Sequence, residues 1–343
     1  MTSKQSIQLG TVQETLLVPL YARAVDARKK RPILNDPKSV EMVDSIDWDF
    51  QRFNQRWRIA AATLRTALFD VRVRDFLNRH PEGTVVEIGT GLNTRLERLD
   101  NGTVHWFDLD LPDSIELRKK FFTDSPRRTT LTASVLDPDW MDAVRQSPGP
   151  YFFVAEAVLI YLTEQQVKLA LSQIAANFPQ ATIAFDSMPL SSIRNGNKDH
   201  ARQKFDARFT WACEDPIEIE RWSIGLRLLD SCSMLDIPGP LRCASPCRRG
   251  PSSASFSNSV RRWRISAGLT SSPCGSKPDR HRWRNGQIAL HRILPQLWQA
   301  DAVQALGSGA VPVVALFAVL CKVQALFLLI PTYAQTDQTI DDK

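Results

Sequence analysis

Cysteine is scarce in this sequence, with six residues in a chain of 343. A disulfide-stabilised scaffold is therefore excluded, and a reducing compartment is expected. The first 30 residues contain no apolar stretch followed by a small-residue cleavage site, so the sequence predicts a cytoplasmic protein without a secretory signal. Glycine and proline, at 15 and 21 residues, are too few for a collagen-like or wholly disordered chain.

Acidic residues are scarce in only one part of the chain. Residues 237–343 hold 13 Lys and Arg against 5 Asp and Glu, whereas residues 1–236 hold 30 against 32. The net charge of +6 therefore belongs to the C-terminal third, and we expect no nucleic-acid partner for the protein as a whole. At roughly 100–200 residues per domain, the length fits one large domain or two small ones.

Apolar spacing divides the first two thirds of the chain into two regions. Residues 1–79 repeat apolar side chains at helical spacing, which predicts an N-terminal helical cap. Residues 80–241 alternate helical patterns with short β-rich runs, which predicts an α/β fold with a doubly wound, mostly parallel sheet. A capping box at Thr163–Gln166 marks one helix start. The predicted strands are Thr84–Ile88, Val104–Phe107, Thr130–Ala133, Tyr151–Ala155 and Ala181–Phe185.

The composition changes at residue 242. Between residues 242 and 284, 26 of 43 residues are Ser, Arg, Pro or Cys, and Asp279 is the only acid. We predict that residues 242–343 form an irregular basic tail without helical or strand periodicity. We hypothesise that a reading-frame shift in the gene produced this tail, and a clean frame encoding it in close relatives would contradict that hypothesis.

Functional alternatives for the tail stay open. Its Arg–Trp clusters at 261–264 and 280–284 are typical of single-stranded nucleic-acid binders, but equally of a disordered basic segment. Its Cys and His residues lack the paired spacing of a zinc site, so no metal is predicted. Residues 310–331 are long and apolar enough to span a bilayer, although Lys322 near the middle disfavours insertion.

The sharpest motif is a strand that runs into Gly89 and Gly91. Glycines at such a turn let a nucleotide-like ligand approach the backbone. The next strand ends in Asp108 and Asp110, 17 and 19 residues past Gly91, where doubly wound folds place an acid on ribose hydroxyls. Thr94 stands where a dinucleotide fingerprint has its third glycine. The pattern therefore favours a ligand without phosphates, such as S-adenosylmethionine, over a nicotinamide cofactor.

A further acid, Glu156, follows the predicted strand Tyr151–Ala155. Doubly wound folds bind their ligands at this edge of the sheet. We expect Glu156 to contact the charged amino-acid end of the cofactor or the substrate. The alternative is a carboxylate satisfied by backbone N–H groups.

From Gln13 to Arg242, the order of motifs resembles the leucine carboxyl methyltransferase family, and within it the bacterial branch of polyketide-synthesis O-methyltransferases. The resemblance implies a Rossmann-like class I methyltransferase fold, S-adenosylmethionine as cofactor and a small-molecule acceptor. The segments that carry it are Glu14–Ala24, Arg65-Thr66, Val73–Leu77, the Gly89 loop, the Asp108 and Asp110 strand end, Ala133–Asp137, Glu156–Tyr161, Glu218–Trp222 and Leu235–Pro238.

The resemblance also implies roles for individual residues. Arg65 corresponds to an arginine that pairs with the cofactor carboxylate, a task that suits a bidentate guanidinium. Where the family has Asp, this chain has Asn93, which keeps the hydrogen-bonding geometry and drops the charge. The implied cofactor-binding set is Arg65, Gly89, Gly91, Asp110 with Asp108 as its rival, Ser134, Val135 and Glu156, with Arg23 and Tyr161 on the substrate side.

The predicted function is O-methylation of a carboxyl group on a small, polyketide-type natural product. A carboxylate is already ionised at neutral pH and needs no general base, so no catalytic residue is predicted. Alignment of the reactants and exclusion of water would then supply the rate. Two alternatives stay open: a catalytically inactive cofactor-sensing or interaction protein, and a protein tethered to a membrane through residues 310–331.

Overall fold

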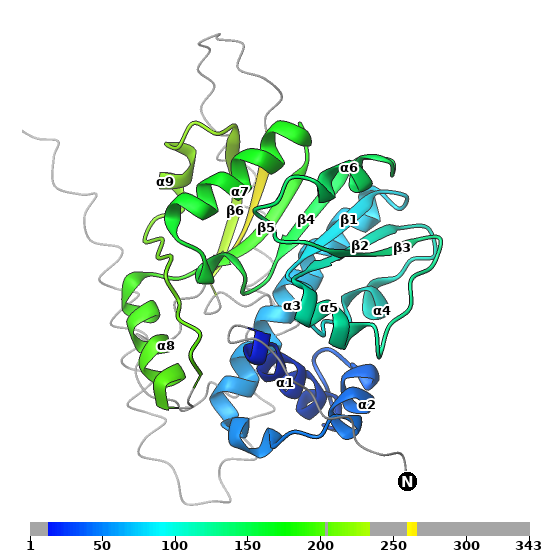
Figure 1. The fold of residues 1–343 in the computed structure, drawn as a ribbon, viewed down its shortest axis with the longest axis vertical. Coiled ribbons are helices and arrows are strands. Elements are labelled where there is room, and N and C mark those ends of the chain that lie inside the picture. The colour runs from blue at the N-terminus through cyan, green and yellow to red at the C-terminus, as the bar shows by residue number, and fades with distance from the viewer. Residues whose placement is uncertain (1–12, 203–204, 234–258, 266–343) are drawn as a thin grey trace, which may run out of the picture. The chain divides into compact units, whose positions relative to one another are not determined.

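A computed structural model describes residues 13–202, 205–233 and 259–265. In this part of the chain, seven strands form one sheet in the order β3-β2-β1-β4-β5-β7-β6 (Figure 1). The apolar segment 310–331 and the tail cysteines considered above lie outside the described residues. None of the described helices has the length and apolarity that crossing a membrane requires.

Five parallel strands form the part of the sheet that the sequence predicted. They are β1 (Thr84–Ile88), β2 (His105–Asp110), β3 (Arg128–Thr132), β4 (Tyr151–Ala155) and β5 (Thr182–Ser187). The central strand β1 pairs in parallel with both β2 and β4. The chain moves outward from β1 to β3 and then returns to β4, so the strand order reverses between β1 and β4. Ligands bind at the carboxyl ends of strands at such a switch point, and the predicted doubly wound fold is confirmed.

Two antiparallel strands complete the sheet. They are β6 (Leu226–Ser233) and β7 (Ser259–Ile265), and β7 lies between β5 and β6. The prediction that regular structure ends at residue 241 was therefore wrong for the seven residues of β7. Ladder pairing uses backbone N–H and C=O groups, which every non-proline residue carries, so an Arg-rich and Ser-rich composition does not exclude a strand.

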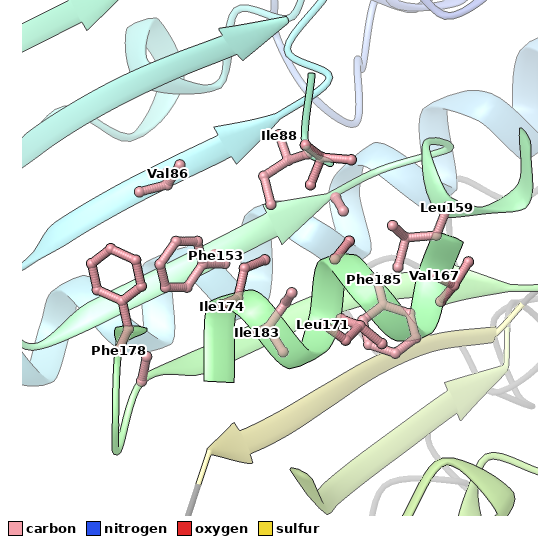
Figure 2. Packing of buried hydrophobic residues seen from close by; sticks show 14 of the residues in the cluster. Val86, Ile88, Phe153, Leu159, Val167, Leu171, Ile174, Phe178, Ile183 and Phe185 are labelled. Atoms are coloured by element: carbon pink, nitrogen blue, oxygen red, sulfur yellow. The ribbon is translucent and has the colours of Figure 1, made fainter. Parts of the chain in front are cut away.

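The pleat of the strands separates two apolar cores. On one face, Val86 and Phe153 pack with helices α6 (Trp140–Arg145) and α7 (Glu164–Asn177). Figure 2 shows Phe153, Ile174 and Phe178 gathered in this core. Helix α7 begins at the predicted capping box, where the Thr163 hydroxyl accepts the Gln166 N–H.

The opposite face, which we call the α3 face, packs on α3 (Arg56–Arg79) and α4 (Arg95–Leu99). Val85 points to this face because side chains of neighbouring residues in a strand point to opposite sides. The remaining described elements are α5 (Pro112–Arg118), η3 (Leu159–Tyr161), α8 (Leu190–Arg202) and α9 (Ile217–Glu220).

Every described element before β1 is helical, as the sequence predicted. These elements are η1 (Gln13–Leu16), α1 (Leu17–Ala27), α2 (Pro37–Ser45), η2 (Phe50–Phe53) and α3. Asp36 caps α2 by accepting the Ser39 N–H at 3.1 Å. The cap has its own apolar core, which includes Leu17, Met42 and Phe53 and extends to Leu92 of the glycine loop. Cap and sheet thus belong to one compact unit.

The core of the sheet generates a stability prediction. Phe153 is fully buried, with its ring 5.0 Å from that of Phe178 and 6.3 Å from that of Trp140. Phe153→Ala should lower the free energy of unfolding by about 3–5 kcal/mol, because it removes apolar contacts and leaves a cavity. Urea denaturation measures this loss. Leu169→Ala, on the 48% exposed side chain of Leu169 in α7, should change stability by less than about 1 kcal/mol; equal losses would contradict the prediction.

Candidate functional site

Four acidic residues lie on the α3 face of the sheet, at the carboxyl ends of neighbouring strands. Each lies two residues after an apolar side chain that packs on this face, and residues two apart share a face. The apolar residues are Val85, Trp106, Val154 and Ala184. The acids that follow them are Glu87, Asp108, Glu156 and Asp186. The strand pleat therefore brings four carboxylates to one edge of the sheet, beside the switch point.

Both carboxylate oxygens of Asp108 accept hydrogen bonds from other side chains of the protein. Its Oδ1 accepts a hydrogen bond from Arg118 at 2.9 Å, and its Oδ2 accepts one from Arg128 at 2.7 Å. Thr90 donates a further bond to Oδ1, and the residue has no exposed surface. Burial opposes its ionisation, but Arg118 and Arg128 outweigh burial and lower the pKa of Asp108. Asp108 thus anchors the sheet edge.

Asp110, the last residue of β2, is partly exposed. Its Oδ2 accepts the Gly91 N–H at 2.6 Å, and its Oδ1 accepts the Leu111 N–H at 2.7 Å. Burial raises the pKa of Asp110 in spite of these bonds. Of the two rival acids, Asp110 is therefore the one with a surface that a ligand can reach.

The glycine loop needs glycine at both predicted positions. Gly89 and Gly91 have φ of 62° and 48°, the left-handed region that side chains other than glycine rarely adopt. A Cβ on Gly89 would lie 2.3 Å from Cγ2 of Val158. The strand-to-loop turn therefore packs directly against the segment that follows β4.

Buried arginines hold the loop carbonyls. Arg118 donates to Gly91 O at 2.8 Å and to Asn93 O at 2.9 Å. Arg23 donates to Leu92 O at 2.6 Å and, through Nε, to Asp36 at 3.0 Å. Three successive carbonyls are thereby fixed from outside the loop.

Arg23, which the resemblance places on the substrate side, makes both of its hydrogen bonds within the described residues. The Arg23 side chain is only 3% exposed, and burial lowers the pKa of its guanidinium in spite of Asp36. Both of its contacts lie within the protein. Arg23 therefore joins the cap to the glycine loop.

Glu156 is the centre of a buried polar network. Its Oε1 accepts bonds from Arg65 Nε at 3.0 Å and from the Thr66 hydroxyl at 2.8 Å, and its Oε2 accepts one from Arg95. Burial opposes its ionisation, but Arg65 and Arg95 outweigh burial and lower the pKa of Glu156 to about 2. The structure thus brings together two predicted residues, Arg65 and Glu156. The sequence motifs did not predict that Glu156 would form ion pairs with Arg65 and Arg95.

Arg95 and Glu87 belong to this network, although no sequence motif predicted them. Arg95 is fully buried and pairs with Glu87, Glu156 and Asp70, the last at 2.9 Å. Burial raises the pKa of Glu87 to about 7 in spite of Arg95. The signal that could have found Glu87 is an acid inside an otherwise apolar buried strand, because such acids are seldom buried without a partner.

Asn93 fits its position in this network. Its side-chain amide donates to Glu87 Oε1 at 2.8 Å. An aspartate here would present a second carboxylate to Glu87, whereas the amide supplies the N–H that Glu87 accepts. The departure from the family pattern is therefore matched by a specific partner.

Part of the Arg65 guanidinium makes no hydrogen bond to the residues that the structure describes. Within the described part of the chain, its Nε–H donates to Glu156 and its terminal nitrogens make no hydrogen bond. The side chain is 14% exposed. Arg65 therefore retains N–H donors that a ligand carboxylate can accept.

Ser134 and Val135 follow β3 and lie beside the end of β2. The Ala133 N–H donates to Asp110 O at 3.0 Å, which brings the turn at Ser134 next to Asp110. The Ser134 hydroxyl accepts the Leu136 N–H at 3.2 Å, and Val135 packs into the core that faces α7. The sheet register thus places these two predicted residues near the ribose candidate.

Tyr161, the last residue of η3, lies on the other side of the site. Its hydroxyl donates to Thr15 Oγ1 at 3.2 Å, and its ring centroid is 5.1 Å from that of Phe209. Burial raises the pKa of Tyr161 to about 12, so its hydroxyl stays protonated at neutral pH.

Substitutions of Asp108 and Asp110 test whether the first carboxylate anchors the sheet edge and the second is exposed. Asp108→Asn should lower the free energy of unfolding by about 3–5 kcal/mol, because it removes the carboxylate that pairs with the buried guanidinium of Arg118 and one of the two that pair with Arg128. Asp110→Asn, on a partly exposed side chain, should cost about 1 kcal/mol or less. Chemical denaturation of both variants measures the difference, and the reverse order would refute this assignment.

Glu156 predicts a pH dependence of stability. Its pKa is about 2 against an ordinary value of 4.5, so it stabilises the fold above pH 4.5, and this contribution is lost as the pH falls from 4.5 toward 2. Glu156→Gln should therefore be less stable than wild type near neutral pH, and the gap should narrow below pH 4.5. Unfolding curves at a series of pH values measure the gap; one that stays constant with pH would show that Glu156 is not held ionised.

Sequence comparisons agree with this geometry. The pattern of the leucine carboxyl methyltransferase family matches residues 17–175. The chain is 34% identical over 240 residues to the tetracenomycin polyketide synthesis O-methyltransferase TcmP of Streptomyces glaucescens, which covers 68% of this chain and 87% of that protein. It is 28% identical over 248 residues to the S-adenosyl-L-methionine-dependent methyltransferase dpfgK of Gibberella zeae, with 65% and 83% covered.

Among solved structures, a DUF574 family protein from Streptomyces avermitilis matches 72% of this chain and 96% of its own, with 13% identity and a TM-score of 0.49. The family of this chain follows from the sequence matches and not from this structural likeness. With the family pattern across the cap and the first four strands, and with a relative more than 30% identical over most of its length, the chain belongs to the leucine carboxyl methyltransferase family of S-adenosylmethionine-dependent methyltransferases.

Proposed function

We propose that this methyltransferase transfers the methyl group to a carboxyl oxygen of a small, polyketide-type acceptor. The observation that carries the proposal is the protonation of two side chains near Arg65, Glu156 and Tyr161. Glu156, with a pKa of about 2, is too weak a base to take a proton from a hydroxyl, and Tyr161 keeps its own proton. A carboxylate acceptor needs no base because it is already ionised. The name of the relative TcmP, an O-methyltransferase of polyketide synthesis, supports oxygen as the acceptor atom.

The residues at the carboxyl edge of the sheet fit S-adenosylmethionine, which supplies an electrophilic methyl group on a sulfonium sulfur. Asp110 offers carboxylate oxygens to ribose hydroxyls, and Gly89 and Gly91 allow close approach to the backbone. The uncommitted N–H groups of Arg65 suit the cofactor carboxylate. Ser134 and Val135 lie on the side of Asp110 where the adenine would follow the ribose.

The chain's own contribution is alignment and exclusion of water. Glu156 and Thr66 fix the orientation of Arg65, and Arg23 holds the cap against the glycine loop. A fixed loop and a fixed arginine reduce the freedom of bound reactants, which lowers the barrier to an in-line displacement. Asn93 gives no support to an inactive protein, since its amide completes the network around Glu87.

Cofactor binding tests the assignment of the site. Asp110→Ala should weaken the affinity for S-adenosylmethionine about 10- to 100-fold, because ribose hydroxyls lose a charged hydrogen-bond partner. Asp113→Ala removes a carboxylate from an exposed position in the next helix and should leave the affinity unchanged. Isothermal titration calorimetry measures both, and equal affinities for the two variants would remove Asp110 from the site.

The methylated product tests the acceptor. With radiolabelled S-adenosylmethionine, 2-naphthoate should yield a methyl ester that releases labelled methanol in mild alkali. The matched probe 2-naphthol yields an alkali-stable ether if a hydroxyl is methylated, and we expect no such product. Ether formation, or no product from either probe by protein that binds the cofactor, would refute the proposal of aromatic carboxyl methylation.

A further inference from the structure

Asp186 is the exception among the four acids of the α3 face. Glu87, Asp108 and Glu156 each accept hydrogen bonds from at least one buried arginine. Asp186 Oδ1 accepts the Ala157 N–H at 2.7 Å. Its Oδ2 is buried and has no hydrogen-bond partner in the described part of the chain, and the residue as a whole has no exposed surface.

Asp186 lies beside residues that we propose to bind the cofactor. The residue lies near the carboxyl end of β5, next to the end of β4, and its bond to Ala157 joins it to the segment that follows Glu156. Three ionisable side chains from neighbouring elements act on it or are acted on by it: Arg65 of α3, Glu156 after β4 and Tyr161 of η3. Asp186 therefore belongs to the same group of residues as the cofactor-binding candidates, on the side of β4 away from Asp110.

An unpartnered buried carboxyl oxygen is costly in either protonation state. An ionised oxygen lacks a donor and a protonated one lacks an acceptor, and buried polar groups in folded proteins are nearly always paired. Burial favours the neutral form and raises the pKa of Asp186 in spite of Arg65. A second negative charge next to Glu156 would be unfavourable as well. A hydrogen-bond acceptor would complement the neutral form of Asp186.

We propose that Asp186 binds the methyl acceptor by donating a hydrogen bond from Oδ2 to one oxygen of its carboxylate while the other oxygen is methylated. This inference rests on the proposed function. In the reaction, the bond from sulfur to methyl carbon breaks, its electron pair stays on sulfur, and the carboxylate oxygen forms the new bond to carbon. The products are a methyl ester and S-adenosylhomocysteine, and the proton stays on Asp186.

Asparagine and alanine at this position separate the roles of Asp186. Asp186→Asn keeps an acceptor for the Ala157 N–H and supplies a donor that cannot ionise, whereas Asp186→Ala supplies neither. Calorimetric titration of 2-naphthoate into full-length protein saturated with S-adenosylhomocysteine measures the effect. At the lowest pH at which the proteins stay folded, we expect Asp186→Asn to bind within about 3-fold of wild type and Asp186→Ala to bind about 10- to 100-fold more weakly.

The pH profile reports on the proton itself. Wild-type affinity for 2-naphthoate should fall as the pH rises and Asp186 loses its proton, and the fall should be absent or smaller in Asp186→Asn. Glu87, with a pKa of about 7, titrates as well, but it does so in both proteins, so the difference between the two profiles isolates Asp186. Affinity for S-adenosylhomocysteine and the melting temperature establish that each variant is folded.

Four results would overturn the inference. They are identical pH profiles for wild type and Asp186→Asn, unchanged affinity in Asp186→Ala, loss in Asp186→Asn as large as in Asp186→Ala, and no binding of 2-naphthoate by wild type. The third result, together with binding of 2-naphthol, would identify Asp186 as an ionised acceptor for a hydroxyl. Ester formation with Asp186-independent binding defeats this inference alone, whereas ether formation from 2-naphthol defeats the proposed function.

Discussion

Buried ion pairs between arginines and strand-end carboxylates determine the geometry of the site. Arg95 has no exposed surface and joins Asp70 of α3, Glu87 of β1 and Glu156 after β4. Charges removed from water are tolerated only when their partners are complete, because one missing member leaves an uncompensated buried charge. Three separate elements are consequently held in one arrangement, and Arg65 takes its orientation from that arrangement through Glu156.

The cap is connected to the sheet by the same chemistry. Asp36 accepts bonds from Arg23 and from the Thr94 hydroxyl, at 3.0 and 2.5 Å, and Arg23 reaches the loop carbonyl of Leu92. Separating the cap from the loop would expose Leu92 and break the bonds from Arg23 to Leu92 O and from Thr94 to Asp36. The cap therefore holds the glycine loop in a fixed arrangement.

Two residues of the site, Asn93 and Asp186, depart from this pattern of carboxylates paired with arginines. Asn93 supplies a neutral donor where Glu87 needs one, so the altered family motif does not imply a weakened loop. Asp186 lacks the arginine partner that its three neighbours on the same face have. At an edge where the protein satisfies most of its carboxylates internally, Arg65, Asp110 and Asp186 are the residues that we propose to face ligands.

The sequence by itself determined the local features of this protein. Strands β1 and β4 begin and end at the predicted residues, and α7 starts at the predicted capping box, because apolar periodicity and capping depend on residues close together in the chain. The tertiary structure decided which charges are free. Arg65 and Glu156 are 91 positions apart and Arg23 and Leu92 are 69 apart, and the choice between Asp108 and Asp110 depends on two arginines from other elements. Partnership and burial of this kind arise only when distant segments pack, so no local pattern could have predicted them; the same holds for β7, whose pairing partners are β5 and β6.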